Sequence, residues 1–368
     1  MDIFPIASHI NYEFREASYL EYGFNLTLIA GGWKHPRASK YTQYTNNQPL
    51  ISETKSYYNL GTRNLTATKQ LNSDGSTIYT KYKYAEDYTD AVMPLKTAHI
   101  FSPVIEEQVW RKNPAGDSVL ISGKINEYSN GRISAIHVLE SAQGIYALNN
   151  ETKTGALYSS LISDTNYKKK VEFKYDATGR VIQQQLTDDT PVSYKWAYPT
   201  LTLSGSPVQG NSYPVAEVKN AKPDSVFYTS FEDVTGTSIV SATGFKAKAD
   251  TFKIKKTFTG SYVLTYWKKT GANPWQLIQQ TLTNPSNYII GTAGSYIDEV
   301  RLHPVKAQMT TYTYRTGIGI ATVNDPNNKI SYYQYDAGGR LKTIKDHKGN
   351  IINEYQYHVK DQISIVAE

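Results

Sequence analysis

Apolar and polar residues alternate along much of this chain, in short runs separated by Gly, Asn, Asp and Pro. Residues 171–176 read VEFKYD, which places Val171, Phe173 and Tyr175 on one face of an extended strand and Glu172 and Lys174 on the other. Similar runs occur in GRVIQQQL, YVLTYWKK and SYIDEVRL. Alternation with a period of two is typical of half-buried β-strands, so the sequence predicts an all-β fold.

One strand–turn–strand phrase occurs twice with the same spacing. Residues 332–357 read YYQYDAGGRLKTIKDHKGNIINEYQY, and residues 171–198 read VEFKYDATGRVIQQQLTDDTPVSYKWAY. The positions shared by the two copies are Tyr175, Asp176, Gly179 and Arg180 in one and Tyr335, Asp336, Gly339 and Arg340 in the other. Looser copies are NEYSNGRISAIHVL and KSYYNLGTRNLTATKQLNSDGSTIYTKYKY. Recurrence at about 20 residues indicates a repeat architecture.

The residue types in this phrase predict an antiparallel hairpin. Asp176 and Asp336 can each accept a backbone N–H of the turn, and Gly179 and Gly339 can adopt the positive φ that closes it. A second turn, DHKGN at residues 346–350, is expected at the opposite end of the unit. Tyrosine suits such a sheet, because its ring packs on a broad surface while its hydroxyl remains available for hydrogen bonding.

Tyr-Asp-x-x-Gly-Arg at this period resembles the YD repeats of bacterial Rhs (rearrangement hotspot) proteins and of related wall-associated or toxin-complex proteins. In that family the hairpins join into a long spiralling sheet, which in the best-known members forms a hollow shell around a toxin. The resemblance implies an open or spiralling YD-repeat sheet over residues 1–223 and 305–368. Residues 1–50 are either a divergent repeat or the truncated end of one.

Residues 224–304 have a different pattern. Alternating strands are broken here by Gly, Asn and Pro turns, and the segment is flanked by Pro223 and Pro304. Its SFED near the start and IDEVRL at the end resemble the first and last strands of carbohydrate-binding-module-like jelly rolls. The resemblance implies a small jelly-roll-like β-sandwich between the repeats, shorter than a typical module.

The same resemblance implies candidate glycan-binding residues. Tyr262, Tyr266, Trp267 and Trp275 supply flat aromatic faces, on which carbohydrate modules stack sugar rings. Because Tyr262 and Tyr266 alternate with residues of the other strand face, at least one of the two faces must belong to the core. Trp275, which follows GANP, is expected to be the most exposed of the four.

The last predicted strand of the sandwich suggests a cation site. Alternation places Asp298 on the same face as Val300 and Leu302, which marks that face as the core side. A buried carboxylate is costly unless it is paired or coordinates a metal. In the modules that this segment resembles, a calcium ion ties the first strand to the last, which implies Glu232 and Asp298 as ligands of a structural Ca²⁺.

Two points of this calcium hypothesis stay open. Asp233 is a possible third ligand, since it follows Glu232 directly in SFED. Alternatively, Asp298 caps the strand or pairs with a lysine such as Lys246 or Lys248. No other cofactor is expected.

Catalytic motifs are missing from the sequence. The seven histidines are scattered, and there is neither a Gly-x-Ser-x-Gly elbow nor a phosphate-binding loop. Asp336 and Asp346 occupy turn positions, where an aspartate is expected without any catalytic role. Zero Cys excludes disulfides and a cysteine nucleophile. The sequence therefore predicts that the protein is not an enzyme.

Charge and hydropathy limit the possible partners. The net charge of +6 is spread along the chain, and Lys253 and Lys255 alternate with apolar residues as on the solvated face of a strand. This pattern predicts no nucleic-acid partner. The apolar runs are too short to span a bilayer. MDIFPIASHINYEF at the N-terminus lacks the features of a signal peptide, so the export that the resemblance implies requires a signal upstream.

Together these features predict a non-catalytic, exported or cell-surface scaffold of the YD-repeat type, which forms part of a larger polypeptide. One alternative is a glycan-binding adhesin that acts through residues 224–304. A second is a fragment of a shell that encapsulates a toxin. The chain ends without an Asp-Pro-x-Gly-Leu type motif, since NDPNNK lacks the Gly-Leu, so no toxin domain is assigned.

Overall fold

The computed structural model describes residues 35–45, 48–72, 74–89, 93–141, 144–145, 148, 153–154, 157–158, 164–197, 201–203, 206–208, 213–233 and 241–357. These residues form an almost purely β structure, which confirms the predicted all-β class. Within residues 1–50, the segment YGFNLTLIA (residues 22–30), whose alternation is strand-like, lies outside the described residues.

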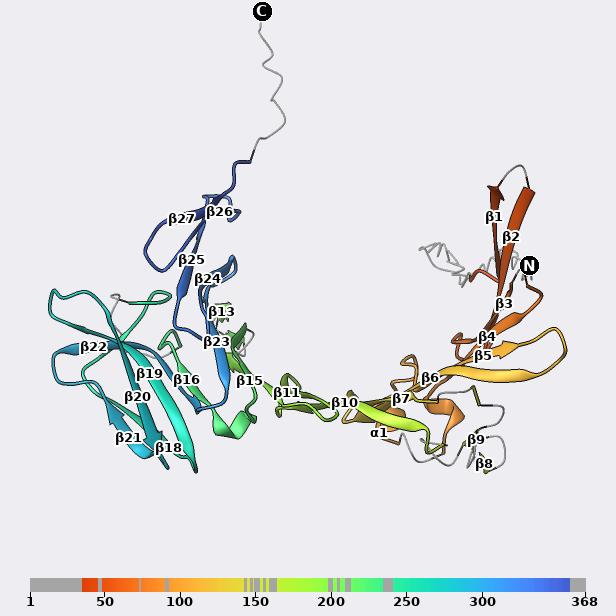
Figure 1. Ribbon diagram of the computed structural model, residues 1–368, viewed down its shortest axis with the longest axis horizontal. Coiled ribbons are helices and arrows are strands. Elements are labelled where there is room, and N and C mark those ends of the chain that lie inside the picture. The colour runs from red at the N-terminus through yellow and green to blue at the C-terminus, as the bar shows by residue number, and fades with distance from the viewer. Residues whose placement is uncertain are drawn as a thin grey trace, which may run out of the picture.

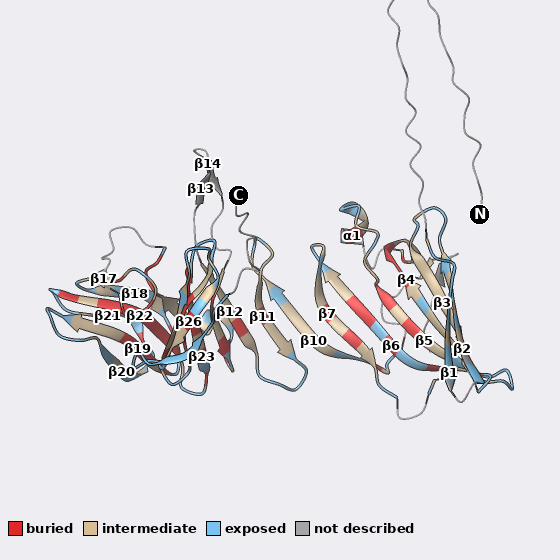
Figure 2. Ribbon diagram, turned by 90° about the horizontal axis from the view of Figure 1, so that it is seen from above, coloured by how far each residue is buried: buried red, intermediate tan, exposed pale blue. Residues whose placement is uncertain are grey.

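One antiparallel sheet runs the length of the molecule (Figures 1 and 2). Within the described residues it has sixteen strands, each hydrogen-bonded to the next. In order across the sheet they are β1 (Ala38–Thr45), β2 (Gln48–Tyr58), β3 (Leu65–Leu71), β4 (Thr77–Lys83), β5 (Glu106–Lys112), β6 (Ser118–Ser129), β7 (Arg132–Leu139), β10 (Tyr167–Tyr175), β11 (Val181–Leu186), β12 (Val192–Ala197), β15 (Tyr213–Lys219), β23 (Gln308–Arg315), β24 (Gly319–Asn324), β25 (Ile330–Tyr335), β26 (Leu341–Lys345) and β27 (Ile351–Glu354).

The turns of this sheet lie alternately along its two long edges. The edge that carries the Tyr-Asp-x-x-Gly-Arg turns is called the YD edge below, and the other is called the opposite edge. On the YD edge a β-bulge sets an aromatic residue opposite the first residue of the returning strand, as in Tyr175–Val181 and Tyr335–Leu341. Because a bulge increases the local twist, its recurrence bends the sheet in the same sense at successive hairpins.

The sandwich is an insertion into one hairpin of the sheet. Strands β15 and β23 pair with each other, from Ala216 opposite Thr311 to Lys219 opposite Gln308, although a whole domain separates them in the sequence. This domain begins after the short 3₁₀ turn η2 (Pro223–Ser225) and ends with the last strand before β23. The repeats on either side therefore form one sheet rather than two.

The sandwich has two layers. A sheet with the order β16–β22–β19–β20, to which β17 adds beside β22, faces the two-stranded sheet β18–β21. The strands are β16 (Phe227–Thr229), β17 (Lys248–Ala249), β18 (Phe252–Thr257), β19 (Ser261–Thr270), β20 (Gln276–Thr283), β21 (Ser286–Ile290) and β22 (Ser295–Pro304). Both layers contribute to one core, in which Ile254 and Ile290 meet Leu264 and Ile297. In Figure 1 the domain lies beside β23–β27 at one end of the molecule.

A second small core lies on the face of the N-terminal half of the sheet. The segment between β4 and β5 includes the 3₁₀ turn η1 (Ala85–Asp87) and the helix α1 (Met93–Thr97), which lies at one edge of the sheet in Figure 2. Tyr88, Leu95 and Ile105 of this segment are fully buried and pack together. Two short hairpins complete the description: β8 (Lys153–Thr154) with β9 (Leu157–Tyr158), and β13 (Leu201–Leu203) with β14 (Ser206–Val208).

Among the described residues, helices that are long and apolar enough to span a membrane were not found.

Candidate functional site

The carboxylate of each YD turn organises the turn backbone. Asp176 Oδ1 accepts the backbone N–H groups of Thr178 and Arg180 at 2.9 and 3.0 Å. The second copy repeats this arrangement, since Asp336 Oδ1 accepts the N–H groups two and four residues on, both at 2.9 Å. Gly179 and Gly339, with φ of 86° and 75°, occupy the left-handed position of the turn, where a side chain would be strained.

The ionised form of these carboxylates is favoured. Burial opposes the ionisation of Asp176, but the hydrogen bonds from Thr178 and Arg180 outweigh it and hold the pKa below its ordinary value. The N–H of Arg340 is the main reason why the pKa of Asp336 is also lowered. Asp346, in the turn at the opposite edge, has a lowered pKa chiefly because the Asn350 side chain donates to it.

The arginine of the phrase connects one turn to the next hairpin. Arg340 Nε donates to Asp336 Oδ2 at 2.8 Å. Its guanidinium group lies over the ring of Tyr357, 4.6 Å from the centroid, which is the geometry of a cation–π contact. Arg180 binds Asp176 in the same way through Nε and a terminal nitrogen.

The tyrosine of the phrase donates its hydroxyl to the backbone of the preceding hairpin. We call the whole series of such bonds the aromatic ladder. It runs from Tyr84 to Leu65 O (2.7 Å), Tyr128 to Val104 O (3.4 Å), Tyr175 to Ile133 O (2.7 Å), Trp196 to Val181 O (2.7 Å), Tyr314 to Pro214 O (2.8 Å), Tyr335 to Ile320 O (2.8 Å) and Tyr357 to Leu341 O (2.9 Å). Every hairpin with its turn on the YD edge from β2–β3 to β25–β26 is thereby joined to the next.

Each acceptor of the ladder lies just beyond the paired part of its strand. Pairing between β24 and β25 ends at Thr322, and the acceptor Ile320 is two residues further toward the YD edge. Likewise, β11 pairs with β12 as far as Gln183, two residues short of Val181. The same offset of two holds at the other five links. The aromatic side chain therefore satisfies a carbonyl that strand pairing leaves without a backbone donor.

The predicted calcium ligands have other partners in the structure. Asp298 is fully buried, and its Oδ2 accepts the N–H groups of Ala242 and Thr243 at 2.8 and 2.9 Å. Glu232 Oε1 accepts those of Phe245 and Lys246 at 2.6 and 2.9 Å. Together the two carboxylates hold the loop of residues 241–246.

The described residues contain no group of three or more acidic or histidine side chains suited to a metal ion. Asp233 is exposed, whereas Glu232 and Asp298 are buried. Lys246 does not pair with Asp298 as the alternative supposed; its Nζ donates to the backbone carbonyl of Glu232. A role of these carboxylates in binding Ca²⁺ stays a prediction.

The predicted orientation of Asp298 is wrong because β22 contains a bulge. Glu299 has a φ of 54°, and the register of β22 with β19 shifts at this point. The extra residue changes the alternation, so that Ile297, Val300 and Leu302 face the sandwich core and Asp298 does not. Burial, followed by the neighbouring Glu299, raises the pKa of Asp298 well above its ordinary value, although three N–H groups favour its charge.

Two charged side chains of β22 point toward the repeat sheet. Glu299 accepts the hydroxyls of Tyr228 (2.9 Å), Thr243 (3.0 Å) and Thr311, as well as the amide of Asn324 (3.3 Å). Thr311 and Asn324 belong to β23 and β24. These bonds connect the sandwich to the repeats through a buried polar network.

Arg301 extends this network and is almost fully buried, at 1% exposure. Its guanidinium donates to the carbonyl of Asp325 at 2.9 Å, to Asn328 Oδ1 at 3.0 Å and to the carbonyl of Met309. All three partners lie in or beside the repeat sheet. The sandwich is therefore fixed on the sheet rather than attached only by its two chain connections.

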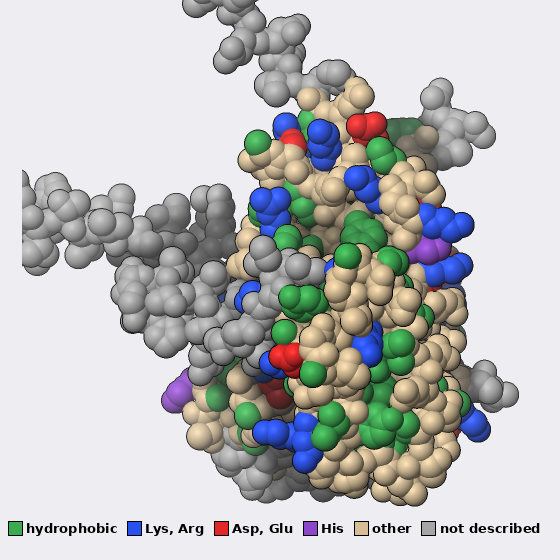
Figure 3. Space-filling view, turned by 90° about the vertical axis from the view of Figure 1, so that its left-hand side faces the viewer, with side chains coloured by type: hydrophobic (Ala, Val, Ile, Leu, Met, Phe, Trp, Pro, Cys, Tyr) green, Lys and Arg blue, Asp and Glu red, His purple; other side chains and the backbone are tan. Residues whose placement is uncertain are grey.

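Two of the predicted glycan-binding residues are unsuitable for stacking. Tyr262 and Tyr266 are 4% and 7% exposed and form part of the sandwich core, so their ring faces are not available to a sugar. Trp267 and Trp275 are partly exposed. On the face of the sandwich end in Figure 3, hydrophobic side chains are scattered between Lys and Arg rather than gathered in one platform.

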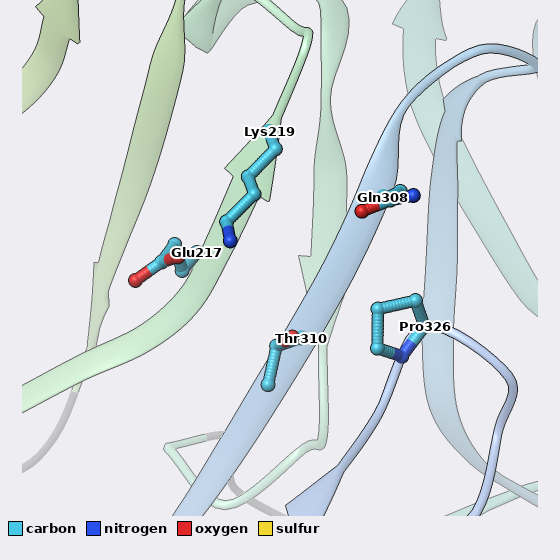
Figure 4. Close-up of a pocket in the computed structure, with 5 residues that line it drawn as sticks. All are labelled: Glu217, Lys219, Gln308, Thr310 and Pro326. Carbon is cyan, nitrogen blue, oxygen red and sulfur yellow. The ribbon is translucent and has the colours of Figure 1, made fainter.

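A small hollow of about 60 Å³ lies on the sheet beside the insertion (Figure 4). It is lined by Glu217 and Lys219 of β15, Gln308 and Thr310 of β23, and Pro326. Pockets for small molecules are usually several hundred Å³ in volume and mostly apolar. This hollow is too small and too polar to suggest a substrate.

Sequence reasoning missed two parts of this arrangement. Trp196 takes the place of a tyrosine in the ladder, and it precedes a long insertion instead of an Asp-x-x-Gly turn. Glu299 and Arg301 were not recognised as buried. No signal in the sequence marks their burial, because charged side chains are mostly exposed unless they are paired.

Comparisons with known proteins assign no family. No protein-family model and no curated protein matches the sequence. Among solved structures, one described as TcdB2–TccC3 without its hypervariable C-terminal region matches at 9% identity with a TM-score of 0.27, over 86% of this chain and 12% of that chain. Another, described as TcdB2–TccC3, matches at 11% identity with a TM-score of 0.22, over 88% and 20%. This chain spans a small part of either protein, and TM-scores this low support no conclusion about its function.

Replacement of Tyr335 by phenylalanine tests the ladder. Tyr335→Phe removes the hydroxyl and leaves the Ile320 carbonyl unsatisfied, so we expect a loss of about 1 kcal/mol of unfolding free energy. Urea denaturation followed by tryptophan fluorescence measures it. Tyr333→Phe is the matched control, two residues away on the same strand, and should change stability by much less. Equal effects of the two substitutions would contradict the ladder.

The lowered pKa of Asp176 predicts a defined loss of stability in acid. A carboxyl group whose pKa is lower in the folded state stabilises the protein above its unfolded pKa of about 4, and this contribution disappears as the pH falls toward the folded value. Asp176→Asn should therefore be less stable than the wild type at neutral pH, with the difference shrinking below about pH 4. Thermal melts across this range measure the difference. A difference that is independent of pH would show that the charge of Asp176 has no role.

Proposed function

We propose that this chain is a non-catalytic structural scaffold of the YD-repeat type, exported or displayed at the cell surface as part of a longer YD-repeat polypeptide. The observation that carries the proposal is the continuous sheet, in which one kind of side-chain link recurs at seven successive hairpins. Such an arrangement maintains a surface over a long distance. The linked hairpins form an extended sheet, and their polar side chains are not gathered at one site where a reaction could occur.

The acidic residues support a structural role. Asp176, Asp336 and Asp346 each bind the backbone of their own turn. Glu232 and Asp298 bind the backbone of the loop 241–246. Since a general acid or base must reach a substrate, carboxylates that are occupied by backbone N–H groups inside turns and loops are poorly placed for catalysis.

The outer strands support a continuation of the sheet by another strand. Within the described residues, β1 and β27 each have a neighbour on one side only. All four residues of β27 are exposed, including Ile351 at 55% and Ile352 at 58%. An exposed apolar strand at a sheet edge is a template for pairing with another chain. The partner that we propose is a further strand of a YD-repeat sheet.

The experiment compares self-association of the wild type and Ile352→Lys by sedimentation velocity over a wide concentration range. A lysine on an edge strand opposes strand pairing, so we expect the wild type to associate as concentration rises and the variant to associate less. Ile121→Lys is the control: Ile121 is 50% exposed but lies on β6, inside the sheet. This control should behave as the wild type. A wild type that stays monomeric throughout would contradict the proposal that β27 is extended.

A further inference from the structure

The buried carboxylate of Glu106 contacts both the amine of Lys83 and the side-chain amide of Gln108, close to the segment that connects β4 to β5. Glu106 Oε2 lies 2.9 Å from Lys83 Nζ, and Glu106 Oε1 accepts Gln108 Nε2 at 2.7 Å. Lys83 ends β4, whereas Glu106 and Gln108 lie on the same face of β5, since they are two residues apart. One carboxyl group thus binds both the amine and the amide nitrogen.

The orientation of the Gln108 amide is fixed by two different partners. Its Oε1 accepts the indole N–H of Trp110 at 2.9 Å, while its Nε2 donates to Glu106. An indole N–H can only donate and an ionised carboxylate can only accept, so the oxygen and nitrogen cannot be exchanged. The N–H of Trp110 also lies where negative charge would develop if the amide carbon were attacked.

Water has little access to this cluster. Lys83, Glu106 and Gln108 are 7%, 1% and 3% exposed. The hydroxyl of Tyr88 donates to Glu106 Oε2 at 2.8 Å, and that of Tyr167 to Oε1 at 3.2 Å. In such a site an amine competes with little water for the amide carbon.

A glycine makes room for one of these tyrosines. A Cβ at Gly123 would lie 2.3 Å from the Tyr167 hydroxyl, so only glycine at this position lets the ring cross β6 and reach Glu106. Gly123 pairs directly with Gln108. The enclosure therefore depends on the residue next to the amide.

We infer that Lys83 and Gln108 form an intramolecular isopeptide bond in this cluster, with Glu106 carrying the protons. Lys83 gives a proton to Glu106 and its neutral amine attacks Cδ of Gln108, forming the Nζ–Cδ bond. The Cδ–Nε2 bond then breaks, and the nitrogen takes that proton from Glu106 and leaves as ammonia. Nζ gives its second proton to Glu106, which passes it to the departing ammonia. A protonated amine and a primary amide thus become a secondary amide and ammonium, so no oxidant or other reactant is needed.

The bond would have a clear mechanical consequence. It would join β4 to β5 side by side and close the chain between Lys83 and Gln108 into a ring, which includes the small core of Tyr88, Leu95 and Ile105. The sequence contains no cysteine, so disulfides are not available for this purpose. A covalent link would be useful in a protein that must keep an extended shape.

Mass spectrometry of the full chain tests the inference. The wild type, folded and incubated at neutral pH, should have an intact mass lower than that of its sequence by one ammonia. Proteolysis followed by tandem mass spectrometry should yield a branched peptide that joins Lys83 to Gln108. A wild-type mass that equals the sequence mass after long incubation overturns the inference.

The variants show which groups react. Lys83→Arg keeps a positive charge beside Glu106 and should abolish the loss of ammonia, as should Glu106→Gln. Lys81→Arg is the matched control, because Lys81 is an exposed lysine directly opposite Gln108 and should not be required. If Lys83→Arg still loses ammonia, or if the loss occurs without the branched peptide, as in succinimide formation at Asn130–Gly131, the assignment is overturned. Circular dichroism of each variant verifies that it is folded.

Discussion

The structure depends on the hydrogen bond from an aromatic side chain to a backbone carbonyl that strand pairing has left free. Strands of successive hairpins lose their pairing as they approach the YD edge, and this pairing stops two residues short of each acceptor. An unsatisfied carbonyl costs free energy when it is removed from water. Tyrosine spans this gap because its hydroxyl lies at the end of a rigid ring. Burial raises the pKa of Tyr314, one member of the ladder, to about 12, so its hydroxyl remains a donor further into the alkaline range than that of an exposed tyrosine would.

The other residues of the repeated phrase support this bond. The carboxylate of Asp176 or Asp336 shapes the turn that follows the tyrosine, and the glycine at positive φ closes it. Arg340 then connects its own turn to Tyr357, the next ring of the ladder. Each unit is local in sequence, yet it is bonded to the unit before it. A sheet can thus grow by addition of hairpins while keeping one curvature.

The repeated phrase made the hairpins and strands of the sheet predictable from the sequence. The spacing of Tyr175, Asp176, Gly179 and Arg180 indicated the hairpins, and alternation indicated the strands. Two features were not visible. Pairing of β15 with β23 joins residues on either side of an entire domain, and no local pattern reports such a contact. The bulge at Glu299 adds one residue to β22, so that Asp298, on its N-terminal side, faces away from the core side that Val300 and Leu302 share.

Amide hydrogen exchange of the wild type tests the central claim most directly, because the two edges of one sheet can be compared in one molecule. If the aromatic ladder keeps the YD edge closed, peptides that contain the acceptors Val181 and Ile320 should be protected nearly as well as the strand centres. Peptides at the opposite edge, such as the turn of residues 187–190, should exchange faster. Equal and rapid exchange at both edges would contradict the account, because the ladder would then leave the splayed strands open.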